Sequence, residues 1–446
     1  MSPGNGRPHL VARLWVIMIT SFVDMVGFLV VLPLLPFYAQ RFGASPSIIG
    51  YLVGVFAIAQ LVTAPFWGRL SDRFGRRPVI LGGIAASAGA FALFALADSV
   101  TVLLLSRLVQ GAAGGTIGVI QAYVIERSRE MTGSTAPRSA AKWRTDRASH
   151  EEGAKALGWV TAATSAGVML GPALGSLAVR FGESAPGFIA AGLCGLNFAF
   201  AWRWMTEPAQ EAEHDPADEL TDPSAVAATP RVAIWRSFAD VLLHPTGLVA
   251  SLVWIYALGM MAFMAMNGVL ALYLAAVFGV TEETIGWFYV FVGAVSLVMR
   301  AAALGPIVDR LGTVRTLRLG LLSLVLGLAV LPLPQSLPSF GLAVMLIPIG
   351  TALLFPATTS LVSRRARRRQ TGQTLGVQQT FGGIARGVGP AWAGLLFQHL
   401  GVASPFWVAA SLVALASLLA LRVTPDQPGA TAPLTEPAAA EAAEPS

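Results

Sequence analysis

The chain has 446 residues, of which 55% are hydrophobic and 12% charged, and its formal net charge is +6. A soluble protein of this length would carry about twice that share of charged residues, so the composition excludes a soluble domain pair. The only cysteine, Cys194, excludes a disulfide framework and a metal site built from cysteines. The basic residues lie in short turns between apolar runs, which is typical of membrane topology and not of nucleic-acid binding.

Apolar runs of roughly the 20 residues that cross a bilayer as a helix follow one another along the chain. The first run is too long for a signal-peptide core and no small-residue cleavage site follows it, so we expect an uncleaved span. Because lipid offers no hydrogen-bond partner to an open backbone, all the runs are expected to be α-helices. The twelve predicted spans lie near residues 12–37, 48–68, 78–97, 100–125, 156–180, 185–204, 246–277, 284–305, 315–334, 339–362, 375–398 and 403–422.

The runs fall into two groups of six, which predicts an all-α membrane protein made of two six-helix bundles. The predicted segments are an N-terminal segment at 1–11, a first bundle at 12–204, a linker at 205–245, a second bundle at 246–422 and a tail at 423–446. The linker is acidic and rich in proline, so we expect it to be flexible. The long polar loop at 127–155 has no counterpart in the second group and predicts an insertion.

The distribution of basic residues predicts the orientation. Of the 30 Lys and Arg residues, only Arg41 and Arg180 lie in loops on one side, and most of the others lie on the opposite side. The positive-inside rule therefore predicts that both termini are cytoplasmic. Only Lys142 and Lys155 are lysines, and this preference for arginine favours a GC-rich bacterial genome and hence a bacterial plasma membrane.

A charged loop occurs twice. The stretch Gly68–Pro78 recurs in looser form at Gly305–Arg315, and each copy joins two apolar runs. A charged turn repeated at the same place in two hydrophobic halves predicts a duplicated membrane protein. The bland alternative, a basic turn that only sets orientation, does not explain an aspartate framed by glycines. The residues expected to form this cytoplasmic gate are Gly68, Asp72, Arg73, Gly75 and Arg76 in the first copy and Asp309 and Arg310 in the second.

Three charged side chains lie deep within predicted spans, namely Asp24, Arg107 and Arg386. A charge inside a bilayer is expensive unless it faces a bundle interior or a wet cavity, so these residues are candidates for proton and substrate coupling. The alternatives are a permanent Asp24–arginine pair and an interhelix hydrogen bond from Arg107. Further candidates for the cavity wall are Gln110, Gln121, Asn267 and Gln378, each of which has an interhelix hydrogen bond as its alternative.

The fifth span carries small residues at helical spacing. Gly167, Gly171 and Gly175 recur every four residues, which predicts a smooth face where another helix approaches closely. Pro172 is expected to bend the helix, and Gly158 precedes this group. An ordinary packing seam is the alternative to a functional motif.

Nothing in the sequence indicates an enzyme. A P-loop is missing, so we do not expect ATP to be the energy source. The five histidines show no metal-ligand spacing. We expect no cofactor and no metal, and a proton gradient as the source of energy.

The repeated loop resembles the signature loop of the major facilitator superfamily, and the chain as a whole resembles its twelve-span drug:proton antiporters. The resemblance implies that Asp72 latches the two halves together on the cytoplasmic side. The second loop copy lacks the double arginine of the first. Gly158, Gly167, Gly171, Pro172 and Gly175 are similar to the antiporter motif of that family, although Ser176 replaces its last glycine.

Two further motifs resemble those of the same family. Arg107, Gln110 and Gly111 match a motif that the resemblance links to proton transfer, and the surroundings of Asp24 are similar to a proton- or substrate-binding segment. We therefore expect a monomer that exports small hydrophobic or amphipathic compounds against protons by alternating access. The alternatives are an uptake permease for a metabolite and a non-transporting sensor. Tetracycline is a less suitable substrate, because the third span lacks the aspartate of tetracycline exporters.

Overall fold

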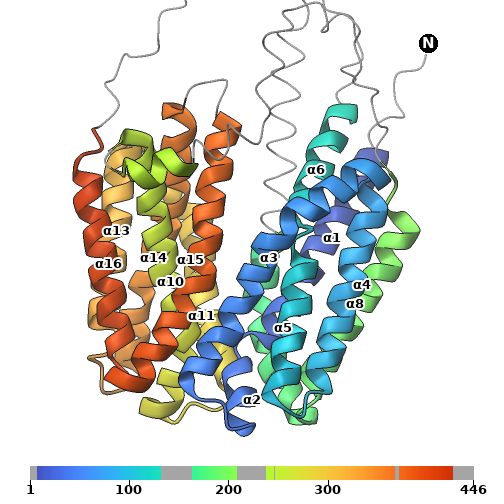
Figure 1. Ribbon diagram of the computed structural model, residues 1–446, viewed down its shortest axis with the longest axis horizontal. Coiled ribbons are helices and arrows are strands. Elements are labelled where there is room, and N and C mark those ends of the chain that lie inside the picture. The colour runs from blue at the N-terminus through green and yellow to red at the C-terminus, as the bar shows by residue number, and fades with distance from the viewer. Residues whose placement is uncertain (1–7, 132–162, 208–237, 246, 367–370, 425–446) are drawn as a thin grey trace, which may run out of the picture.

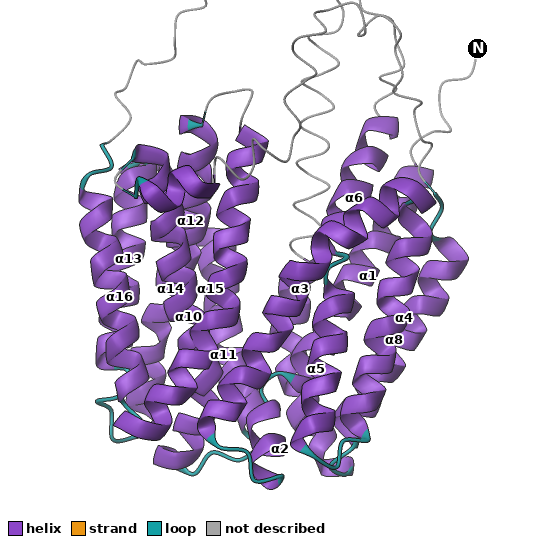
Figure 2. Cartoon of the chain, viewed as in Figure 1, coloured by secondary structure: helices purple, strands orange, loops and turns teal. Residues whose placement is uncertain are grey.

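The computed structural model describes residues 8–131, 163–207, 238–245, 247–366 and 371–424, and within these ranges it contains helices and no strands (Figure 2). The predicted all-α class is confirmed for this part of the chain. Most of the predicted insertion, the linker and the tail lie outside the described residues, as do residues 1–7.

The first half of the chain forms one bundle (Figure 1). Its helices are α1 (Pro8–Val31), α2 (Leu35–Arg41), α3 (Pro46–Phe74), α4 (Arg76–Ala95), α5 (Val100–Gly114), α6 (Ile117–Met131), a helix at 163–178 that continues into η1 (Val179–Phe181), and α8 (Ala185–Trp204). Two of the spans are interrupted helices, because α1 and α2 together cross the bilayer, as do α5 and α6.

The second half forms a matching bundle beside the first. Its helices are α10 (Leu248–Phe278), α11 (Ile285–Val298), the π-helical turn η3 (Met299–Ala303), α12 (Leu304–Leu311), α13 (Thr313–Val330), α14 (Leu337–Arg365), α15 (Thr371–Leu400) and α16 (Ser404–Leu421). The segment from α11 through α12 is one continuous span.

Ten of the predicted spans are long and apolar enough to cross a membrane within the described residues. The remaining two are the helix at 163–178, whose predicted start lies outside these residues, and α15. The helix α15 has 30 residues, but polar side chains and glycines lower its hydropathy. Such a composition suits a helix whose neighbours are other helices and a polar cavity more than lipid.

The same glycine turn ends a helix in both repeated loops. Gly75 separates α3 from α4 with φ 93°, and Gly312 separates α12 from α13 with φ 78°. Only glycine adopts a positive φ of this size without steric strain, which is the physical reason for a glycine at this position in both loop copies. The two loops lie at the same end of the molecule, which we call the loop end.

The two bundles touch closely at the opposite end, which we call the closed end. Here α3 crosses α15 at a distance that only glycines allow: a Cβ atom added at Gly54 would lie 2.3 Å from the carbonyl oxygen of Gly387. A Cβ atom at Gly50 would likewise lie 2.3 Å from the carbonyl oxygen of Pro390. The bundles approach each other near α2 and diverge toward the loop end (Figure 1).

Candidate functional site

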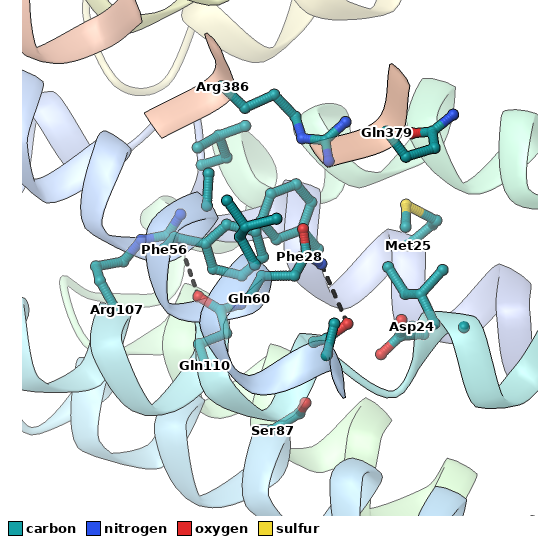
Figure 3. A pocket seen from close by; sticks show the side chains of 18 of the residues that line it. Asp24, Met25, Phe28, Phe56, Gln60, Ser87, Arg107, Gln110, Gln379 and Arg386 are labelled. Atoms are coloured by element: carbon teal, nitrogen blue, oxygen red, sulfur yellow. Dashed lines mark hydrogen bonds between the residues drawn. The ribbon is translucent and has the colours of Figure 1, made fainter. Parts of the chain in front are cut away.

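A cavity of about 670 Å³ lies between the two bundles (Figure 3). Its lining reaches from Leu32 and Val53, on the side of the closed end, past Asp24 and Arg386 to Pro65 and Gln121, on the side of the loop end. Most of its wall is apolar or aromatic. The charged side chains of its lining are Asp24 from α1, Arg107 from α5 and Arg386 from α15. The structure therefore brings together the three charged residues that the sequence places within spans.

Arg107 is the most deeply buried of these charges, since only 1% of its surface is exposed. Its Nη1 donates a hydrogen bond to Oε1 of Gln110, one helical turn later on α5. Its guanidinium also lies over two aromatic rings, 4.9 Å from the centroid of Phe56 and 5.7 Å from that of Phe28. Its Nε and Nη2 have no hydrogen-bond partner in the described part of the chain. Cation–π contacts thus replace part of the hydration that burial removes.

Asp24 lies half-buried in the wall of the cavity. Among the described residues no ion pair or hydrogen bond joins its carboxylate to a side chain. The permanent Asp24–arginine pair considered from the sequence is therefore not present here. A carboxylate without a partner, in a polar part of an otherwise apolar wall, is free to bind a proton or a ligand cation.

Arg386 faces the cavity from the other bundle (Figure 3). It is half-buried, and in the described part of the chain its guanidinium makes no hydrogen bond or ion pair. Gln379 lies two turns earlier on the same helix and also lines the cavity. A face of α15 is thus polar at mid-depth.

The predicted neutral wall residues divide into two pairs. Gln110 and Gln121 line the cavity. Gln378 does not: it is fully buried, and its Nε2 lies 3.4 Å from Oγ1 of Thr359 on α14. Asn267 also lies outside the lining, and its Nδ2 donates a 2.8 Å hydrogen bond to the carbonyl oxygen of Phe263. Gln378 therefore makes the interhelix contact that was the alternative to a cavity role, whereas the Asn267 bond stays within α10.

Aromatic and thioether side chains complete the lining, and the sequence did not single them out. Phe28 lies one helical turn after Asp24, and Phe56 one turn before Gln60. Residues at this spacing share a helix face, which is a signal that would have found them. Met25 and Met264 contribute flexible apolar surface from the two halves.

Charged and polar groups join the bundles at the closed end. Arg41 on α2 pairs with Glu282, just before α11, and also lies 2.9 Å from Glu183. Ser176, 1% exposed, donates a 2.7 Å hydrogen bond to the carbonyl oxygen of Glu282 and accepts a 2.8 Å hydrogen bond from the Gly286 amide. The residue that departs from the antiporter motif thus links the two halves.

We expect Ser176→Ala to weaken this closure. The substitution removes two hydrogen bonds between the bundles, each of which contributes about 0.5–1.5 kcal/mol. The fraction of molecules in which the bundles have separated at the closed end, near Arg41, should rise several-fold. This is measured as a longer distance between spin labels at Gln40 and Val402. Ser411→Ala is the matched control, because among the described residues that hydroxyl donates its hydrogen bond to the carbonyl oxygen of Trp407 in its own helix. Equal distance distributions for both variants would contradict the prediction.

The loop end holds its charges within the first bundle. Arg76 lies 2.7 Å from Asp72 and 2.8 Å from Glu126 on α6. The Glu207 carboxylate accepts hydrogen bonds from the backbone amides of Arg76 and Arg77, at the start of α4. In the second copy, within the described residues, Asp309 and Arg310 make no comparable ion pair. The asymmetry between the two copies is thus visible in their contacts.

Two further residues of the predicted cytoplasmic gate, Arg73 and Gly68, have different surroundings. Arg73 stacks on the ring of Phe74, 5.4 Å from its centroid. Gly68 has open space where a Cβ atom would lie. In the part of the chain that the structure describes, no hydrogen bond or ion pair joins the gate residues of the first loop copy to the second bundle.

The glycines of the fifth span pack against α1. A Cβ atom added at Gly175 would lie 2.2 Å from the carbonyl oxygen of Val30, and one at Gly167 would lie 2.7 Å from that of Phe22. Gly171 likewise faces α1, whereas Pro172 faces α11 of the other bundle. The remaining residue of this motif, Gly158, lies outside the described residues.

Comparison with known proteins decides the family. The model of the Major Facilitator Superfamily matches residues 17–390, and a further match covers 252–444. The chain belongs to this family. It is therefore a multi-pass membrane transporter and not an enzyme, and the predicted resemblance is confirmed.

Curated relatives extend over most of the chain. It is 28% identical over 392 residues to multidrug resistance protein 2 of Bacillus subtilis, covering 86% of this chain and 88% of that protein. It is 25% identical over 399 residues to the class B tetracycline resistance protein of Escherichia coli, covering 87% and 89%. Among solved structures, the human organic anion transporter MFSD10 superposes with a TM-score of 0.64 at 22% identity, covering 93% of this chain and all of that one.

Proposed function

We propose that this transporter is a proton-coupled antiporter that exports small hydrophobic or amphipathic compounds, as a drug efflux protein does. One observation carries the proposal: the cavity between the bundles brings together a carboxylate that is unpaired among the described residues, a buried arginine and aromatic side chains. Relatives named for multidrug and tetracycline resistance support export. The fold supplies the two halves that alternating access needs.

In this proposal the loop end faces the cytoplasm of a bacterial cell and both termini lie on that side. The basic residues of the loops favour this orientation. The cavity then opens inward while the Arg41–Glu282 contact and the α3–α15 crossing close the outer side. This state loads substrate from the cytoplasm or the inner leaflet. The protein acts as a monomer, because each chain contains both halves of the cavity.

In this proposal the charged residues have different roles in coupling transport to protons. Asp24 binds a proton when the cavity faces outward and releases it when the cavity faces inward, and substrate binds to the deprotonated form. Arg107 holds the local potential positive, which favours release of the proton. Asp72 and Arg76 stabilise the loop end when it closes. The energy comes from the proton gradient, with no cofactor or metal.

The direction and the coupling are tested together in proteoliposomes. The purified protein is reconstituted, a pH gradient is imposed, and a panel of fluorescent amphipathic dyes is followed. We expect dyes to accumulate in the compartment from which protons leave, and an uncoupler to abolish this accumulation. Movement of dye in the same direction as protons would indicate an uptake permease and would overturn the proposal. The absence of any transport by folded protein would support a sensor instead.

A further inference from the structure

Two opposite charges in the cavity make no ion pair or hydrogen bond among the described residues, although Tyr256 lies close enough to Arg386 to interact with its charge. The Asp24 carboxylate and the Arg386 guanidinium both line the cavity, and neither makes an ion pair or hydrogen bond among the described residues. They also do not pair with each other. Charged groups that are removed from bulk water and left unpaired are costly, so a site that keeps two of them is suited to a ligand that satisfies both.

The two charges come from different bundles. Asp24 lies on α1 and Arg386 on α15, and Figure 3 shows them at different sides of the cavity, with Phe28 and Phe56 near its centre. A ligand that contacts both must therefore carry its charged groups at separate positions. The aromatic rings between them offer a surface for a flat apolar body.

Arg107 does not compete for this role. The residue is 1% exposed, and its guanidinium lies against the Phe56 and Phe28 rings and is hydrogen-bonded to Gln110. It adds a second positive charge to the wall, however, so the described lining holds two arginines and one carboxylate. A ligand with only positive charge would face a net positive wall, whereas a ligand with only negative charge would lie near Asp24 without a partner for it.

We propose that the cavity binds zwitterionic amphipathic compounds, with a cationic amine at Asp24, an anionic carboxylate at Arg386 and a flat apolar body against Phe28 and Phe56. This inference rests on the proposed export function and names its substrate class. It also explains the coupling, because the amine and the proton compete for one carboxylate. The carboxylate group of the ligand, held by Arg386, ties the substrate to the second bundle.

The test uses one fluorescent scaffold in four forms. The parent is a piperazinyl quinolone carboxylic acid, which is a zwitterion. Its methyl ester keeps only the amine, its N-acetyl derivative keeps only the carboxylate, and the doubly modified form keeps neither charge. Equilibrium binding to purified protein in detergent is measured without any gradient, for the unmodified protein and for Arg386→Gln, Asp24→Asn and Arg300→Gln. Arg300 is the matched control, because it lies in the π-helical turn η3 and outside the cavity lining.

We expect the zwitterion to bind best. Arg386→Gln should weaken binding of the parent and of the N-acetyl form by about tenfold, as for the loss of one charge-assisted contact, and leave the methyl ester unchanged. Asp24→Asn should weaken binding of the parent and the methyl ester and spare the N-acetyl form. Arg386→Lys should restore part of the affinity, and Arg300→Gln should change none.

Two results would overturn the inference. One is a methyl ester that binds the unmodified protein as tightly as the parent does. The other is an Arg386→Gln variant that behaves like Arg300→Gln with all four compounds while keeping the thermal stability of the unmodified protein. Because no gradient is used, the outcome is separate from that of the export assay. If export fails and this binding pattern holds, the proposed function is wrong, and only the preference of the cavity for zwitterionic ligands stands.

Discussion

Replacing Asp24 by asparagine is expected to abolish proton-coupled transport while leaving the protein folded. The amide has nearly the same volume as the carboxylate, so the cavity keeps its shape. An amide neither binds nor releases a proton near neutral pH, and Asp24 is the one carboxylate in the described cavity lining. Accumulation of dye against its gradient in proteoliposomes should therefore fall to background, and proton release upon addition of substrate should disappear.

The matched variant is Asp24→Glu, which keeps a titratable carboxylate one methylene further from α1. We expect it to retain coupled transport at a reduced rate, because the proton site is displaced but present. Facilitated exchange of dye without a gradient should persist in Asp24→Asn if the substrate still binds through its other contacts. Undiminished gradient-driven accumulation by Asp24→Asn would show that the proton binds elsewhere.

Much of the architecture follows from the sequence because the bilayer restricts what an apolar run can do. A long run has to be a helix, so the spans follow from length alone. The repeated loop predicted the duplication, and Gly75 and Gly312 turn the chain in the same way in both halves. Interruptions such as the one between α1 and α2 were not predicted, because they leave the hydropathy of the run unchanged.

The cavity was predictable only where a charge marks it. Asp24, Arg107 and Arg386 stand out because charges in lipid are costly, and all three line the cavity. Neutral amides carry no such signal: Gln378 and Gln379 are adjacent, yet only Gln379 lines the cavity. Adjacent residues on a helix point about 100° apart, so which of them faces the cavity depends on how α15 is rotated, and packing against α3 and α10 determines that rotation.

Gly54→Ala is expected to prevent the closed end from forming and thereby to stop transport. The added methyl group would lie 2.3 Å from the backbone oxygen of Gly387, which cannot move aside as a side chain does. Overpacking of this kind costs about 1–3 kcal/mol. Only the state in which α3 and α15 touch bears that cost. The equilibrium between the two conformations should therefore shift about 5- to 150-fold toward molecules whose bundles have separated at the closed end. The distance between spin labels at Gln40 and Val402 should lengthen accordingly.

A transporter works only if both states are populated, so a shift of this size slows the cycle even though the fold is intact. Gly89→Ala is the control: it adds the same methyl group to a membrane-embedded helix, but no other helix in the described part of the chain comes within 4 Å of that position. If Gly54→Ala and Gly89→Ala transport equally and show the same label distances, then the close crossing of α3 and α15 is not the gate. A longer distance with lost transport in Gly54→Ala alone would identify this backbone contact as one that has to form in every cycle.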